Sequence, residues 1–362
     1  MVIHDGIIKW WVQNVLSKRM TKYEPGFIVT EFSSRYGNAF QRIIILPEDI
    51  LVEIEKQVVE KHGEKGEEVL KKIGREYGYN FAYTLGAPTI DKGKEFIEKF
   101  LRFSVNYGLG SLAREVKLIE LDIKNGRFGT EFNQRVICRK NGIGHLLDYT
   151  VMGFMEYALK RSLKIVESKC QGRGDAICRI SLEYDYGDLP KLHFNPTLNT
   201  KYRKFNEIRP IHYSAVSMSG LLKDKIVKLE EDFFVHNNQV IIFFESGLLY
   251  LINHYLQNEL SFKENLFDIG LNGINGFIEN YSITKVGDML SSWGYGDYLY
   301  KKNNGKPVAY LTSFPWYPLL ETQDFPLLRG MLSAFLLKDQ QDVRFSNTKL
   351  VSDVDKITLV FD

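Results

Sequence analysis

The residues best suited to chemistry lie between positions 138 and 178, which hold all three cysteines of the 362-residue chain. Cys170 and Cys178 are eight residues apart in the segment ESKCQGRGDAIC, residues 167–178, and the Gly-x-Gly turn between them predicts a hairpin with both thiols at one end. Thiolates combined with one imidazole or carboxylate form closed tetrahedral zinc sites, which are structural rather than catalytic. The pattern therefore favours a structural metal site. Two thiols that pack as small apolar groups, or a redox pair, are the alternatives.

Glu167 is a further candidate ligand with a less favourable position. It precedes Cys170 by three residues, so strand alternation alone points it to the opposite face of its strand. A bulge or twist is needed to bring its carboxylate to the thiols.

The same segment resembles the end of the vinyl-4-reductase-type domain. That domain forms the sensory module of bacterial enhancer-binding transcription regulators that respond to phenol and xylene, and similar folds occur in vesicle-tethering adaptor subunits and in a subunit associated with chlorophyll vinyl reduction. The resemblance covers about residues 40 to 184, including 117–123, 126–128 and 131–132. The family pattern Glu-x-x-Cys-x-Gly-x-Gly-x-x-x-Cys is met at Glu167, Cys170, Gly172, Gly174 and Cys178.

The resemblance implies a structural zinc ion held by a first Cys, the Glu and the two terminal Cys. Nine residues before Gly153, where the family has its first Cys, this chain has Gly144 followed by His145. Cys138 lies six residues before Gly144. We therefore expect Cys138, Glu167, Cys170 and Cys178 as ligands, with His145 as the alternative to Cys138.

The resemblance also implies a buried ligand pocket beside the metal. The His and Trp that bind the phenol hydroxyl in the sensors correspond here to Asn106 and Gln134, which argues against phenol and leaves another small hydrophobic or aromatic ligand. The walls are expected on helices 66–84 and 92–105 and the facing sheet, although residues of these types more often form plain core than line a pocket. The expected lining residues are Ile73, Tyr77, Phe81, Phe103, Leu118, Leu121, Phe128, Phe132 and Tyr149.

Helices and strands separate into blocks along the chain, which predicts an α+β fold with antiparallel sheets. Apolar runs at 114–123 and 128–138 flank an Asn-Gly turn, a strong hairpin signal. The remaining expected elements are helices over 4–20, 48–61, 66–84, 92–105 and 145–160 and strands over 27–31, 43–46, 163–169 and 177–183.

The order of these elements repeats in the second half of the chain, which predicts a tandem duplication. The expected units are a zinc-bearing domain at 1–185, a linker at 186–210 and a divergent second copy at 211–362. In that copy the positions of Glu167, Cys170 and Cys178 become Arg344, Asn347 and Lys356, so no metal is expected there. The corresponding segments are 42–48 with 239–245, 106–110 with 292–296, 124–127 with 303–306, Gly153 with Gly330, and 175–182 with 353–360.

Composition narrows the function classes. The 47 Lys and Arg nearly balance the 45 Asp and Glu, leaving a formal charge of +2 that argues against direct nucleic-acid binding. We find no apolar run long enough to span a bilayer and no secretory signal at the start, so a cytoplasmic location is expected. No phosphate-binding loop, metalloprotease motif or nucleophile elbow occurs, so the protein is not expected to be an enzyme.

The sequence therefore predicts a non-enzymatic regulator that binds a small hydrophobic or aromatic ligand, contains structural zinc and signals through a partner protein. Its two copies are expected to form an intramolecular pseudo-dimer or a homodimer. The alternative is a protein-interaction adaptor of the vesicle-tethering type.

Overall fold

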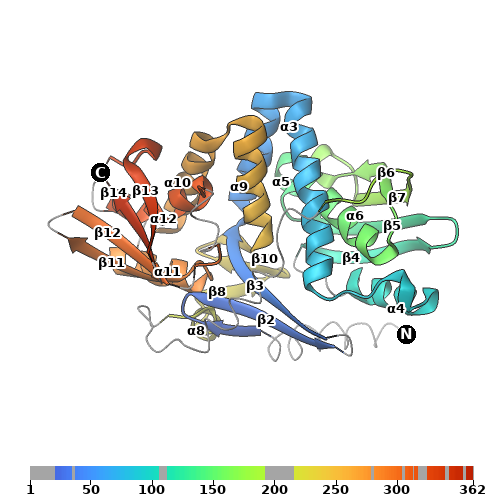
Figure 1. The fold of residues 1–362 in the computed structure, drawn as a ribbon, viewed down its shortest axis with the longest axis horizontal. Helices are drawn as coiled ribbons and strands as arrows, with labels where there is room; N and C mark the ends of the chain where they lie inside the picture. The colour runs from blue at the N-terminus through green and yellow to red at the C-terminus, as the bar shows by residue number, and fades with distance from the viewer. Residues whose placement is uncertain are drawn as a thin grey trace.

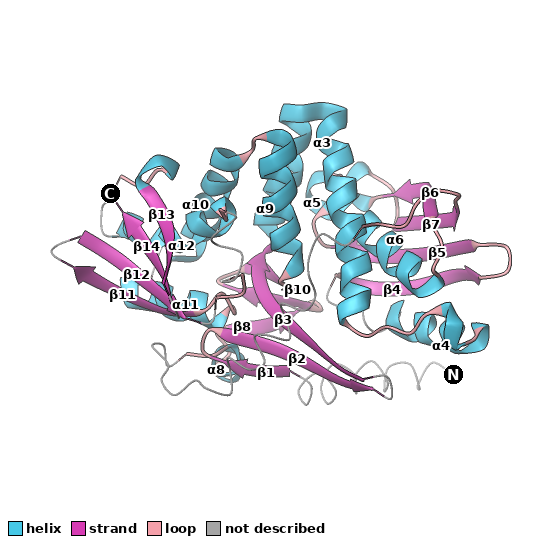
Figure 2. Ribbon diagram, viewed as in Figure 1, coloured by secondary structure: helices cyan, strands magenta, loops and turns pink. Residues whose placement is uncertain are grey.

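The fold was analysed in a computed structural model, which describes residues 21–34, 37–105, 112–191, 216–278, 281–303, 306–312, 314–316, 324–338, 342–353 and 356–361. Helices and antiparallel sheets form several units (Figure 2), so the predicted α+β class is confirmed. The expected helix over 4–20 lies outside the described residues, as does most of the expected linker. None of the helices in the described ranges combines the length and apolar character needed to cross a bilayer.

The central sheet takes strands from both halves of the chain. Its order is β1-β2-β3-β10-β9-β8, and β3 pairs with β10 in antiparallel register, with Ile44 opposite Phe244. The first and second halves are therefore joined through one continuous hydrogen-bonded sheet. The strands are β1 (Thr21–Glu24), β2 (Phe27–Ser34), β3 (Gly37–Pro47), β8 (Val227–Glu230), β9 (Phe233–His236) and β10 (Gln239–Glu245).

Two further sheets flank the centre, on the right and left in Figure 1, and they have the same strand order. In the first half the order is β4-β5-β7-β6, and in the second half it is β11-β12-β14-β13. The two flanking sheets thus share one topology, while the tandem duplication stays a prediction. The strands are β4 (Ala113–Asp122), β5 (Arg127–Arg135), β6 (Leu163–Lys169), β7 (Cys178–Tyr184), β11 (Asp297–Asn303), β12 (Lys306–Thr312), β13 (Thr348–Asp353) and β14 (Lys356–Phe361).

The long helix α3 (Glu48–Thr84) stands over the central sheet beside α9 (Gly247–Leu260), as Figure 1 shows. The sequence predicts two helices here, over 48–61 and 66–84, and the structure confirms them as two helical segments of α3 that meet at a break at Gly63, where φ is 52° and ψ is −135°. A positive φ is accessible to glycine at little cost. The other helices are α4 (Lys94–Phe103), α5 (Cys138–Asn141), α6 (His145–Leu159), α8 (Met218–Lys223), α10 (Lys263–Ile278), α11 (Ile283–Ser292) and α12 (Pro326–Lys338), with short 3-10 turns at Ile90–Lys92, Gln171–Arg173 and Phe345–Asn347.

Glycines set the close crossing of one helix pair in each half. A Cβ at Gly153 in α6 would lie 1.9 Å from the Arg75 carbonyl oxygen of α3, and a Cβ at Gly330 in α12 would lie 2.0 Å from the Phe267 carbonyl oxygen of α10. The equivalence of Gly153 and Gly330 in the sequence thus has a common physical basis. In both halves, two helix backbones touch at a point where only hydrogen fits.

Two apolar cores hold the units together. The larger contains side chains of both halves, including Ile44, Tyr77 and Phe244, so the two halves share this core. The smaller lies in the first half among α4, α6 and the β4–β7 sheet, and includes Phe128 and Phe132. The domain limits expected from the sequence stay a prediction.

We predict that Gly153→Ala and Gly330→Ala each lower the free energy of unfolding by about 1–3 kcal/mol, because the added methyl group forces two helices apart. Urea unfolding would measure the change. Gly220→Ala is the matched control, since its Cβ would meet no atom closer than Ser217 Oγ at 3.8 Å. Equal stability of all three variants would contradict the close crossings.

Candidate metal centre and ligand site

The structure brings together the three cysteines from three separate elements. Cys138 begins α5 just after β5, Cys170 precedes the 3-10 turn after β6, and Cys178 is the first residue of β7. Their sulfur atoms lie within 4.8 Å of one another, and Cys138 Sγ is 3.6 Å from Cys178 Sγ. All three residues are fully buried. This confirms that they lie close enough together to bind a metal.

The hairpin loop is shaped to place Cys170 against Cys138. The Cys170 backbone N–H donates to Asp175 Oδ2 at 2.8 Å, and the Cys170 thiol donates to the Cys138 carbonyl at 3.3 Å. A Cβ at Gly172 would lie 1.9 Å from that same carbonyl oxygen. The first glycine of the Gly-x-Gly turn is therefore required because the Cys138 backbone passes directly over it.

Helix α3 holds the segment that carries Cys138. Buried Glu48 accepts hydrogen bonds from the Ile137 backbone N–H at 2.8 Å and from Arg139 Nη2 at 2.7 Å. Buried Glu55, two turns further along α3, accepts the Leu146 backbone N–H at 2.9 Å. These carboxylates satisfy backbone donors at the starts of α5 and α6, which otherwise have no helical partner.

Arg135 places a buried positive charge beside the thiols. Its Nε donates to Cys138 Sγ at 3.1 Å, and its Nη1 pairs with Asp148, which also accepts the Ser168 hydroxyl at 2.8 Å. A Cβ at Gly144 would lie 2.6 Å from Arg135 Nη2. The guanidinium thus fills the space next to the position at which the resembling family has its first Cys.

Hydrogen bonding makes the three thiols unequal. Hydrogen bonds with Cys138 and Cys170, together with the Gln171 N–H, lower the pKa of Cys178 well below that of a free thiol. Hydrogen bonds with Cys170 and Cys178 raise the pKa of Cys138. A cation that binds a thiolate takes the place of the thiol proton, so metal binding at this cluster releases protons.

The donor set fits a thiophilic metal such as zinc at three positions. Three thiolate sulfurs at these separations suit Zn²⁺, but a closed zinc site takes four ligands. Within the described ranges, no His, Asp, Glu or further Cys lies within the same 4.8 Å limit. The fourth ligand is therefore not identified among these residues.

Glu167 does not lie with the cysteines. It sits on β6 opposite Ser181, and its carboxylate contacts Ser181 Oγ at 3.2 Å and Lys169 Nζ at 2.8 Å. A bulge does occur between Ile165 and Glu167, but Glu167 stays on the face of Ser181 and Arg179, away from Cys178. The expectation that Glu167 joins the cluster is therefore not met, because the bulge does not offset the three-residue spacing.

His145 also stays apart from the thiols. It is the first residue of α6, and its Nε2 lies 3.6 Å from Glu67 of α3. Of the two candidates for the first ligand, the geometry places Cys138 at the cluster and His145 outside it.

The expected ligand-lining residues are divided between different parts of the fold. Tyr77 belongs to the larger core, where its hydroxyl accepts the Glu245 backbone N–H at 3.2 Å, and Phe81 packs against that core. Phe128 and Phe132 belong to the smaller core. The described residues therefore do not gather these four rings around one pocket.

The other expected ligand contacts are placed as follows. Phe103 on α4 is 44% exposed, and Gln134 is exposed with a φ of 53° at the end of β5. Neither is positioned as the polar or aromatic wall of an enclosed cavity. Asn106 lies outside the described residues.

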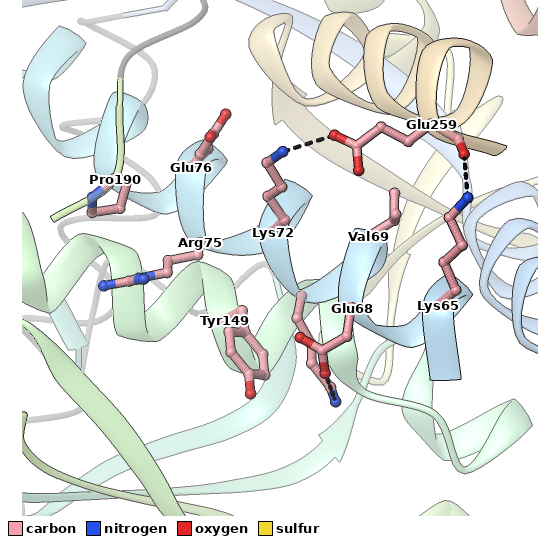
Figure 3. A pocket seen from close by; sticks show the side chains of 10 residues that line it. Lys65, Glu68, Val69, Lys72, Arg75, Glu76, Tyr149, Pro190 and Glu259 are labelled. Carbon is pink, nitrogen blue, oxygen red and sulfur yellow. Dashed lines mark hydrogen bonds and ion pairs between the residues drawn. The ribbon is translucent and has the colours of Figure 1, made fainter. Parts of the chain in front are cut away.

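A cleft of about 440 Å³ lies among α3, α6 and α9 (Figure 3). Its lining is mostly charged, and Lys72 pairs with Glu259 at 2.7 Å while Lys65 donates to the Glu259 carbonyl at 2.9 Å. Such a lining does not suit the hydrophobic ligand expected from the sequence. The lining residues are Lys65, Glu68, Val69, Lys71, Lys72, Arg75, Glu76, Tyr149, Pro190 and Glu259.

Several residues that matter to the site were missed at the sequence level. Arg135, Glu48 and Glu55 act on partners 13 to 91 positions away, so no local pattern reveals them. Asn80 is different, because it is a polar residue within the apolar part of α3. It is 2% exposed, and neither its Nδ2 nor its Oδ1 has a partner.

Comparisons with known proteins give limited likeness. No protein-family model matches the chain, and no curated protein is significantly similar to it. Among solved structures, the chain is similar to the phenol-responsive sensory domain of the transcription activator PoxR, crystallised with phenol. The identity is 17% and the TM-score 0.33, over 55% of this chain and 98% of that one.

We predict that Glu55 makes stability fall as pH rises. Burial raises the pKa of Glu55 from 4.5 to about 7 in the folded protein, so between these values the folded state keeps a proton that the unfolded state has lost. The free energy of unfolding should fall by up to about 3 kcal/mol across this interval. Chemical denaturation at pH 5 and 7.5 would measure it.

Glu55→Gln should flatten that dependence, whereas Glu64→Gln should keep it, because Glu64 is exposed on the same helix. An unchanged pH slope in Glu55→Gln would contradict the assignment.

Proposed function

We propose that this protein is a non-enzymatic regulator that binds a small hydrophobic or aromatic molecule and signals through a partner protein, with a structural zinc ion in its first half. The observation that carries the proposal is the buried cluster of Cys138, Cys170 and Cys178. Two of these cysteines belong to the motif on which the family resemblance depends, and the third is the candidate first ligand. Their convergence supports that resemblance, and the proposed function follows from it.

The surroundings of the cluster support a structural role for the metal. The sulfurs are sealed from solvent, and Arg135, Asp148 and Ser168 link Cys138 to α6 and β6. A catalytic zinc ion needs an open coordination position that substrate can reach. A buried set of thiolates tied to three elements instead stabilises the fold when metal binds.

Metal analysis of the purified chain tests this proposal. We expect one zinc ion per chain, and we expect Cys170→Ser to lose most of it and to unfold at lower temperature. Glu167→Gln is the informative control, since its carboxylate lies on the other face of the sheet and the variant should keep its metal. Metal-free wild-type protein, or a Cys170→Ser variant with full zinc content, would refute the metal site.

Native mass spectrometry of the chain from its own host tests the regulatory part. A releasable small molecule bound together with zinc is the expected result. Zinc with a stoichiometric protein partner and no small molecule would favour the second candidate function, an interaction adaptor.

One observation favours that second candidate. At the edge of the central sheet, Ile226 and Leu229 beside and within β8 are 44% and 60% exposed. An edge strand with exposed apolar side chains offers both unpaired backbone groups and apolar area to a partner.

A further inference from the structure

A group of buried aromatic side chains lies in the second half, where β9, α10 and α11 meet. His236 ends β9, Phe277 is in the last turn of α10, and Trp293 caps the C-terminus of α11. The ring centroids of His236 and Trp293 are 5.7 Å apart, and those of Phe277 and Trp293 are 5.1 Å apart. None of the three is more than 1% exposed, so the group is closed to bulk water.

Two polar atoms of this aromatic group have no hydrogen-bond partner among the described residues. His236 Nε2 lies 2.8 Å from the Tyr281 hydroxyl, whereas His236 Nδ1 and Trp293 Nε1 are each buried without a donor or acceptor. A buried polar atom left unpaired costs its full desolvation energy, and native proteins rarely tolerate it. Two such atoms on neighbouring rings call for a partner that is not among the described residues, either a buried water or a bound molecule.

A second buried indole in the described part of the chain shows that this arrangement is particular to Trp293. Trp316 is equally buried, at 1% exposure, but its Nε1 donates to the Ser246 carbonyl at 3.2 Å. The fold thus satisfies one buried indole N–H and leaves the other available.

The chemistry of the aromatic group selects the kind of partner. Burial lowers the pKa of His236 to about 4, so the ring is neutral near pH 7. When Nε2 accepts the Tyr281 hydroxyl proton, the ring proton is on Nδ1, and the indole Nε1 is always a donor. Two donors among aromatic rings call for an acceptor, and an ion without a counter-charge would be costly to bury there.

The backbone of Trp293 connects this group to the seam between the halves. Its carbonyl accepts the Ile45 N–H at 3.0 Å, and Ile45 lies opposite Phe243 in the β3–β10 pairing. A molecule that contacts the Trp293 side chain would therefore touch a residue whose backbone is hydrogen-bonded to β3, one of the two strands that join the halves.

We propose that the second half binds a small uncharged molecule through an oxygen acceptor that faces Trp293 Nε1 and His236 Nδ1. This inference rests on the proposed function and deepens it, because it gives the sensed molecule a chemical class and a site in the copy that lacks cysteines.

Nuclear magnetic resonance of the full chain carrying [15N]tryptophan tests the site. The probe is acetophenone, which has one carbonyl acceptor on a single ring, and ethylbenzene is its control without oxygen. We expect acetophenone to shift the Trp293 indole N–H resonance saturably, with little effect from ethylbenzene. The Trp316 indole should stay unchanged, because its N–H is already bonded. The chain has four tryptophans, and Trp293→Phe and Trp316→Phe identify the signals of these two.

His236→Phe should weaken acetophenone binding roughly three- to tenfold, the effect of losing one neutral hydrogen bond. A Trp293 signal that acetophenone does not move would overturn the proposal and leave water as the partner of these atoms. Equal shifts with ethylbenzene would show that binding needs no oxygen acceptor, and would overturn the chemical class that we propose for the ligand. Either failure is separate from that of the proposed function, which is judged by zinc content and by the molecule released from the native protein.

Discussion

The antiparallel pairing of β3 with β10 is the constraint on which the rest of the structure depends. Ile44 and Phe244 are opposite each other, and the Ser246 N–H extends the contact by donating to the Arg42 carbonyl. Separating the halves would expose apolar side chains of the larger core and leave backbone groups of both strands unpaired, and each of these changes is costly. The two halves therefore fold as one body, although their flanking sheets have the same order and could each have formed a separate domain.

Helix α3 connects the β3–β10 pairing to the cysteine cluster. Its carboxylates Glu48 and Glu55 bind the backbone on either side of Cys138, and Glu76 accepts the Tyr255 hydroxyl of α9 at 2.6 Å. Buried carboxylates are stable only when such donors surround them. Helix α3 thus links the cysteine cluster, the glycine crossing with α6 and the second half.

Much of the fold could be predicted from local pattern. The Asn-Gly turn gave the β4–β5 hairpin, and the strands and the helix around the cysteine motif lie within a few residues of their expected limits. The shared sheet could not be predicted, because it depends on contacts between residues about 200 positions apart. The site was foreseen in part. The cysteines meet, whereas Glu167 lies across the sheet and the expected aromatic wall is divided between two cores.

The sequence by itself determined the types and order of the elements and the presence of three cysteines within loop reach, because periodicity and turn chemistry are local properties. Tertiary structure alone decided which side chains share a space. The face on which Glu167 lies, the guanidinium of Arg135 beside Cys138 and the unpaired nitrogens of His236 and Trp293 all follow from how distant segments pack. Burial and hydrogen-bond satisfaction are properties of that packing. The spacing of residues along the chain does not reveal them.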